Sequence, residues 1–194
     1  LVPSQTVSRT GYREVDLTDH VAESKKADWG IYYRPFENNF EISYVGKWGT
    51  GQTVYQGANR YGIENFTMSQ HKLEVKDDNF FVRAYVTEDN AGDSYDMNFT
   101  AININRIWSD SGYSQGIRNG DGDNVWFGNY VNGFAGATLG GATEAQAHAA
   151  GRSVADAGRV LAGTAEFDRL FQEVVNDPDL TTGAKFQDLS LIHI

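Results

Sequence analysis

The sequence contains no cysteine and only three prolines among its 194 residues. Without cysteine there is no disulfide framework and no thiolate metal site, so the small disulfide-stapled folds of secreted proteins are excluded. No stretch reaches 18 consecutive apolar residues, which excludes a transmembrane helix. It does not exclude a membrane β-barrel, because barrel strands alternate apolar and polar residues.

Basic residues are also scarce. The chain carries 16 Lys and Arg against 26 Asp and Glu, a net charge of -10. Nucleic-acid phosphates are neutralised by clustered Lys and Arg, so we expect no nucleic-acid partner. The four histidines, at positions 20, 71, 148 and 193, have no metal-ligand spacing. We therefore expect no metal and no cofactor.

The sequence has no initiating methionine or signal segment at its start and no turn or helix cap at its end. It begins at Leu1 and ends with the segment 189–194. We expect an internal piece of a longer protein, in which the end is either the start of a next strand or an artificial tail.

Alternation of apolar and polar residues predicts antiparallel strands between residues 27 and 106, the last of them over 95–104. In the third strand, Phe66 and Met68 fall on even positions but Leu73 and Val75 on odd ones, which predicts a bulge near residues 70–71. One parity of the strands supplies the candidates for contact with lipid. They are Trp29, Ile31, Tyr33, Phe40, Ile42, Tyr44, Val82, Ala84 and Val86.

Helices are predicted only near 143–177. Thr143 begins a capping box before an alanine-rich helix, and Thr164 caps a second helix with an apolar stripe. The expected organisation is an entering segment at 1–26, antiparallel strands at 27–106, a long loop insertion with two helices at 107–185, and a next strand or tail at 186–194. The predicted fold class is all-β dominated, with up-and-down strands and this helical insertion.

Two short motifs suggest chemistry but lack the context that it needs. Residues 112–116 match G-x-S-x-G around Ser114, without the preceding strand and following helix of a nucleophile elbow. Asn119, Asp121 and Asp123 have the spacing of a calcium loop, but glycine and glutamate are missing at its sixth and twelfth positions. We therefore predict no enzyme and no catalytic residue; a hydrolase using Ser114 is the weakest alternative.

Aromatic residues make up 13% of the chain, and tyrosines gather near the expected strand ends. The interfacial girdles of a membrane barrel place aromatic residues there. A soluble sheet enriched in tyrosine has the same appearance. The pattern alone leaves both open.

Several short motifs follow one another along the chain: GTG at 49–51, TVYQG at 53–57, NRY at 59–61, HKLE at 71–74, DNFFVR at 78–83, AGDSYD at 91–96, AHAA at 147–150, ADAGR at 155–159 and GAKFQD at 183–188. In these motifs the sequence resembles the barrel of TonB-dependent outer-membrane receptors of the Bacteroidetes type. The likeness spans roughly residues 10–188. It covers none of the family's plug, TonB box or terminal aromatic strand, which identifies an internal fragment of the barrel.

The resemblance implies a partial transmembrane β-barrel in the outer membrane of a Gram-negative bacterium. The expected role is uptake of a scarce nutrient: a siderophore, corrinoid, glycan or peptide. Its partners would be outer-membrane lipid, the nutrient, and the TonB complex through parts of the receptor outside this sequence. Loops carry most binding residues. The candidate ligand contacts are Tyr55, Asn59, Arg60, Tyr61, Trp108, Trp126 and Tyr130.

The expected strand order leaves open which end of the sheet faces outward. Five up-and-down strands would put the long insertion at the same end as the short turns 37–39 and 76–79, whereas long barrel loops face outward. Either a strand is miscounted around 48–64 or the short turns face outward.

The alternative function is a secreted soluble β-sandwich that binds carbohydrate, with Trp48, Trp108 and Trp126 as a stacking platform.

Overall fold

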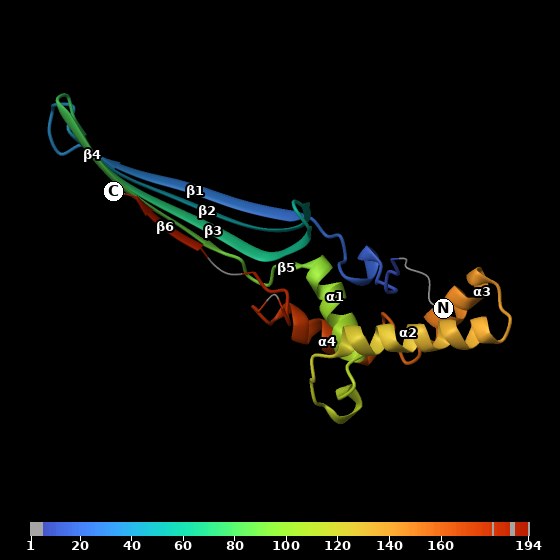
Figure 1. Ribbon diagram of the computed structural model, residues 1–194. Coiled ribbons are helices and arrows are strands. Elements are labelled where there is room, and N and C mark those ends of the chain that lie inside the picture. The colour runs from blue at the N-terminus through green and yellow to red at the C-terminus, as the bar shows by residue number, and fades with distance from the viewer. Residues whose placement is uncertain (1–5, 180, 187–188, 194) are drawn as a thin grey trace.

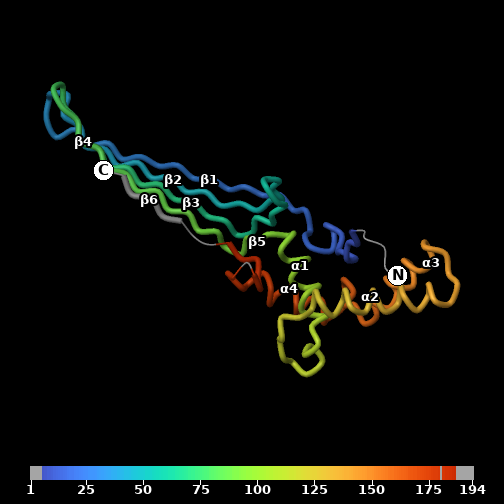
Figure 2. Tube along the Cα trace, in the orientation of Figure 1, coloured from blue at the N-terminus to red at the C-terminus, as the bar shows by residue number. Residues whose placement is uncertain are grey.

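A twisted antiparallel sheet forms one half of the molecule, and helices gather beyond one of its ends (Figure 1). The computed structural model describes residues 6–179, 181–186 and 189–193. Strands β1 (Glu23–Tyr33), β2 (Glu41–Gln56), β3 (Arg60–Asp77) and β4 (Phe80–Asn90) pair in chain order, and their traces run side by side in Figure 2. The short strand β5 (Tyr95–Asp96) pairs with β3.

The end of the described chain returns to this sheet. Strand β6 (Leu189–His193) pairs antiparallel with β4, in the segment expected to be either the start of a next strand or an artificial tail. In the described residues β1 pairs only with β2, and the sheet is open.

Two short turns lie together at the end of the sheet far from the helices, which we call the tip. They span residues 34–40 and 78–79, and the Asn39 side chain links them by donating a 2.6 Å hydrogen bond to Asp78. The turn between β2 and β3, at 57–59, lies at the opposite end, beside the helices (Figure 1).

The strand predicted over 95–104 forms only at its first two residues, in β5; from Met97 the chain forms helix α1 (Met97–Trp108), so the rest of that prediction is wrong. Asp96 caps this helix, because its carboxylate accepts the backbone N–H of Phe99 at 2.9 Å. The buried positions Met97, Thr100 and Ile104 follow helical spacing and form one buried face of α1.

Because this segment is mainly helical, the conflict over which end of the sheet carries the long insertion disappears. The strand count around 48–64 was right, and the miscount lay at 95–104. After β4 the chain forms only the two-residue strand β5 before the helices begin, so the insertion lies at the end opposite the tip turns.

The helical unit, residues 97–175, contains four helices where two were predicted. Helices α3 (Glu144–Ala155) and α4 (Ala165–Val175) confirm the caps expected at Thr143 and Thr164. Helix α2 (Gly122–Leu139) was predicted as loop. The fold is thus an open antiparallel sheet combined with helices. The predicted antiparallel strands are confirmed, and the description as all-β dominated is not.

The core lies in the helical unit and at its junction with the sheet. The segment predicted only as an entering segment packs against this unit. Its Arg9 guanidinium lies 5.7 Å from the ring centroid of Trp108 and 5.4 Å from that of Trp126, and it donates a 2.7 Å hydrogen bond to Asp123. Residues 6–22 therefore fasten the start of β1 to the helices.

The bulge expected near residues 70–71 is also wrong. Pairing between β2 and β3 is continuous from Glu41 to Gly51, and the register shifts between Gly51 and Thr53. The shift lies opposite Asn65, whose φ of 51° is in the left-handed region. Phe66 and Met68 therefore belong to the other face of the sheet from Leu73.

Candidate functional site

The sheet has two chemically opposite faces. Directly paired residues lie on the same side of an antiparallel sheet, so the register assigns each side chain to a face. One face, the apolar face, carries Trp29, Ile31, Tyr33, Ile42, Tyr44, Trp48, Leu73, Val75, Val82, Ala84 and Val86. The sequence-based candidates for contact with lipid thus share one face, except Phe40, which lies in a tip turn.

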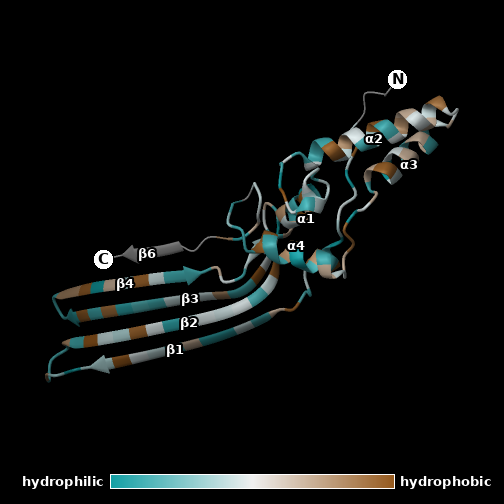
Figure 3. Cartoon of the chain, turned by 90° about the horizontal axis from the view of Figure 1, so that it is seen from below, coloured by the Kyte–Doolittle hydropathy of each residue, from teal (hydrophilic) through white to brown (hydrophobic). Residues whose placement is uncertain are grey.

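This apolar face is uncovered in the described part of the chain. Ile31 is 66% exposed, Val82 64% and Leu73 51%. The helices lie beyond one end of the sheet, and none of them crosses this face (Figures 1 and 3).

The opposite, polar face carries charged side chains in mutual contact. Its polar residues are Lys26, Asp28, Glu41, Ser43, Lys47, Gln70, Lys72, Glu74, Lys76 and Arg83. The same face also carries Tyr32, Val45, Phe66, Met68, Phe81 and Tyr85, so it is mixed, whereas charged side chains are rare on the apolar face. Glu41 is buried and accepts from Lys76 at 3.0 Å and from Arg34 at 2.6 Å, and these two cations lower its pKa. Arg83 likewise lowers the pKa of Glu74 from 2.5 Å. Both carboxylates are held ionised between cations.

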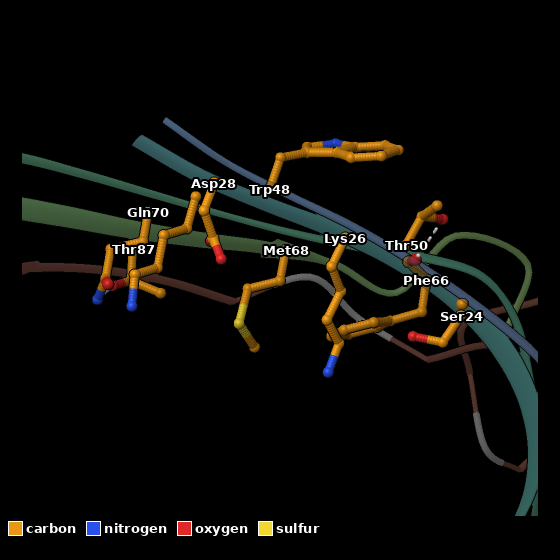
Figure 4. Close-up of a pocket in the computed structure, with 12 residues that line it drawn as sticks. Ser24, Lys26, Asp28, Trp48, Thr50, Phe66, Met68, Gln70 and Thr87 are labelled. Atoms are coloured by element: carbon orange, nitrogen blue, oxygen red, sulfur yellow. Dashed lines mark hydrogen bonds between the residues drawn. The ribbon is translucent and has the colours of Figure 1, made fainter. Parts of the chain in front are cut away.

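A hollow of about 430 Å³ opens on the polar face near the middle of the sheet (Figure 4). Its floor lacks side chains at Gly49 and Gly51 of β2. In Figure 4 the side chain of Trp48 points away from the hollow, to the apolar face, whereas Lys26 and Met68 point to the hollow's side of the sheet. The side chains that line it are those of Ser24, Lys26, Asp28, Lys47, Phe66, Met68, Gln70 and Thr87.

The composition of the hollow suits a ligand with an apolar body and polar edges. Phe66 and Met68 offer apolar surface, and Lys26, Lys47 and Asp28 offer charge beside it. None of these residues was predicted. The available signal was that Phe66 and Met68 are apolar at positions whose parity belongs to the polar face.

Four of the predicted ligand contacts lie together at the turn between β2 and β3. Tyr55 and Tyr61 are paired across the strands and stack with ring centroids 6.1 Å apart. Arg60 donates a 2.7 Å hydrogen bond to Glu14, and the side chain of Asn59 donates one of 2.6 Å to Asp96. Tyr55 is 56% exposed, so this cluster offers an aromatic surface beside polar groups that are already paired.

The other three candidates are far from a ligand-accessible surface. Trp108, Trp126 and Tyr130 are buried, with at most 7% exposed. Tyr130 stacks between Trp126 and Phe134, one helical turn to each side. The spacing of four residues in this aromatic series was the signal that α2 is a helix and that these rings are core.

Neither chemical motif forms a site. Ser114 lies in a short 3-10 turn after a loop, without the strand and helix of a nucleophile elbow. Asp123 of the calcium-like spacing pairs with Arg9 and Arg106, and Asp121 accepts hydrogen bonds from Ser111. Across the described ranges, no group of three His, Asp or Glu side chains could hold a metal ion.

No family model, curated protein or solved structure matches this chain. Within the part of the chain that the structure describes, no helix has the length and apolarity to span a membrane.

Proposed function

We propose that this chain forms part of the wall of an outer-membrane β-barrel of the TonB-dependent receptor type, which binds and admits a nutrient and catalyses no reaction. The observation that carries the proposal is the pair of opposite faces on one long sheet. Lipid would contact the apolar face, and the barrel lumen would lie on the polar face. Barrel strands have this alternation of apolar-out and polar-in residues.

The energetics favour lipid over water at the apolar face. Removing a large apolar side chain from water contributes about 1.5–3 kcal/mol, so this set of side chains represents on the order of 10 kcal/mol. That is comparable to the whole stability of an ordinary domain. Soluble monomers rarely leave such a continuous patch exposed, because covering it stabilises them so strongly.

Strand length and edge chemistry agree with the proposal. A barrel strand crosses a bilayer with about 9–11 residues. Strands β1 and β4 have 11 residues each, and β2 and β3 have 16 and 18. Further strands of the barrel would pair with the open edge of β1, since unpaired backbone groups are costly in lipid.

The role in uptake rests on the resemblance and on the polar face. The hollow and the stacked pair of Tyr55 and Tyr61 lie on elements that the wall would hold rigidly, and they are the candidate contacts for a siderophore, corrinoid, glycan or peptide. The TonB complex would act through other parts of the receptor.

The soluble β-sandwich alternative has no comparable support. A sandwich packs two sheets face to face, whereas the described residues form a single sheet. Of its expected stacking platform, Trp108 and Trp126 are buried in the helical unit.

Two neighbouring residues of β1 provide a matched test of the wall. Ile31 on the apolar face is 66% exposed and Tyr32 on the polar face 64%, so in water both would be equally accessible. The described sequence has no cysteine, and Ile31→Cys or Tyr32→Cys adds a single thiol to it. In isolated outer membranes, a water-soluble maleimide should label Tyr32→Cys and spare Ile31→Cys until the membrane is dissolved in denaturant. Equal labelling of the two variants, or recovery of the protein in the soluble fraction, would refute the proposal that the chain forms part of a membrane-barrel wall.

Uptake is tested separately by deleting the gene. Growth on one limiting nutrient should fail in the deletion strain and return when the gene is restored. If restored growth does not depend on TonB, the receptor part of the proposal is wrong.

A further inference from the structure

We propose that the bilayer covers only the tip half of the sheet, and that the outer ends of β2 and β3 project beyond it and carry the helical unit on the cell exterior. This inference rests on the proposed function and adds two things to it: the level at which the membrane ends, and the direction in which the wall is inserted.

The level follows from reading the apolar face row by row across the four strands. The row nearest the tip pairs Tyr33, Ile42, Val75 and Val82, and the next pairs Ile31, Tyr44, Leu73 and Ala84. The third row contains Trp29, Gly46, His71 and Val86, and the fourth contains Ala27, Trp48, Ser69 and Glu88. The fifth row is polar throughout: Lys25, Thr50, Thr67 and Asn90. The apolar band therefore ends at the fourth row.

The length of this band suits a tilted barrel strand. Successive rows are two residues apart, or about 6.6 Å along a strand. The four rows therefore span about 20 Å along the strands, and Phe80, which pairs with Asp77 beyond the first row, marks the limit at the tip. From Phe80 to Glu88 the band covers nine residues of β4, within the roughly 9–11 residues with which a tilted barrel strand crosses a bilayer.

Aromatic side chains mark both limits of the band. Trp48 lies in the fourth row, at the polar boundary. Tyr33, Phe36 and Phe80 lie at the tip, each at least half exposed. Aromatic girdles of this kind occur where barrel walls meet the two lipid–water interfaces.

The histidine of the third row, His71, is partnered. The hydroxyl of Tyr44 and Nδ1 of His71 share a hydrogen bond of 2.7 Å. The indole of Trp29 lies over Gly46, where an added Cβ would come within 2.2 Å of the ring, and its edge contacts His71 with centroids 6.3 Å apart. Gly46 thus leaves room for an indole that shields the imidazole. Such partnering lowers the cost of a polar group in lipid.

The direction follows from the lengths of the connections. Both tip turns, 34–40 and 78–79, are short. At the other end the turn 57–59 is short as well, but the long connection from β4 to β6, residues 91–188, is there. Barrels have short periplasmic turns and longer extracellular loops. The tip therefore faces the periplasm, and the helical unit stands outside.

The projecting part of β2 and β3 is joined firmly to the helical unit. Beyond Thr50, β2 continues for six residues to Gln56, about 20 Å. At its end Asn59 bonds to Asp96, the cap of α1, and β5 pairs with β3 at Tyr61 and Gly62. Sheet and helices thus meet at a fixed junction above the membrane.

Spin labels on one strand test the level of the membrane. Single cysteines at Leu73, Ser69 and Thr67 sample the second, fourth and fifth rows of β3 on the same face. The labels are attached in the full-length receptor, reconstituted in phosphatidylcholine vesicles, with any cysteine elsewhere replaced by serine. Relaxation by oxygen relative to a water-soluble nickel chelate should fall several-fold from position 73 to position 67, with position 69 between them.

The outcomes separate this inference from the proposed function. If the label at position 73 is relaxed mainly by the chelate, the apolar face does not contact lipid, and the proposed function is wrong. Positions 73 and 67 both in lipid would overturn only the proposed level and leave the wall standing.

Direction is tested on intact cells with a maleimide too large to cross the outer membrane. Leu139, at the end of α2, is 80% exposed, and Asn79, in a tip turn, is exposed as well. Leu139→Cys should be labelled and Asn79→Cys should be labelled only after lysis. The reverse pattern would overturn the proposed direction.

Discussion

The close approach of helices α2 and α3 gives a sharp prediction about two glycines. In the middle of a helix, Gly→Ala normally stabilises by about 1 kcal/mol, because glycine loses more conformational freedom on folding. Gly128 of α2 and Gly151 of α3 should nevertheless respond with opposite signs.

The structure distinguishes these two positions by what an added methyl group would meet. At Gly128 nothing lies within 4 Å of an ideal Cβ. At Gly151 the Cβ would be 2.8 Å from the backbone oxygen of Tyr130 and 3.3 Å from Cβ of Phe134. A backbone oxygen cannot rotate away as a side chain can, so the two helices must separate.

The expected magnitudes follow from these contacts. Gly128→Ala should gain about 1 kcal/mol of stability from helix propensity alone. Overpacking a close helix contact costs about 1–3 kcal/mol, and the rigid carbonyl places Gly151 at the upper end. After the same propensity gain, Gly151→Ala should lose about 2 kcal/mol.

The assay is urea unfolding of the full chain, followed by helical circular dichroism and by tryptophan fluorescence, to which Trp126 contributes; this residue stacks on Tyr130 in the same contact. Gly136→Ala is a second open control, because nothing lies within 4 Å of its Cβ. If Gly151→Ala stabilises the protein as much as these controls do, the close packing of α2 on α3 is refuted.

Two further predictions concern the anchoring segment and pH. Arg9→Ala should lower the free energy of unfolding by about 3 kcal/mol in the same assay, since it removes two cation–π contacts and a charge-assisted hydrogen bond. The control Arg13→Ala should change it little, because Arg13 is exposed and pairs with nearby Asp16. Equal effects of the two variants would contradict an anchoring role for Arg9. Arg169 lowers the pKa of Glu166 to about 2, with a further hydrogen bond from Tyr113. A carboxylate with a lowered pKa stabilises the fold above its ordinary pKa near 4.5, and this contribution is lost as the pH falls towards 2. Glu166→Gln should reduce the loss of stability across that window, and an unchanged pH profile would count against the pairing.

Local rules were sufficient where a structure depends on neighbouring residues. Thr143 and Thr164 predicted the starts of α3 and α4, because a cap needs only a side-chain oxygen and the N–H groups of the next turn. They were insufficient at α1 and α2. A short series of alternating apolar residues such as 95–104 fits a strand and a buried helix face equally, and only packing against the core chose the helix.

The candidate site shows the same division. The cluster at Tyr55, Asn59, Arg60 and Tyr61 was found because its residues are neighbours in sequence around a turn. The hollow was missed because it is assembled from four strands, and a single sequence does not state which residues of separate strands are opposite each other. Trp126 was mistaken for a loop residue because glycines around it obscured the helical spacing.

By itself, the sequence determined that β1 to β4 would each have two different sides, since alternation with period two is a local property of a strand. Only the tertiary structure decided that the apolar sides coincide on one uncovered face, because strand register is set by pairing between distant segments. It also decided that α1, and not a fifth long strand, follows β4 and the short β5, and hence that the helices lie opposite the tip.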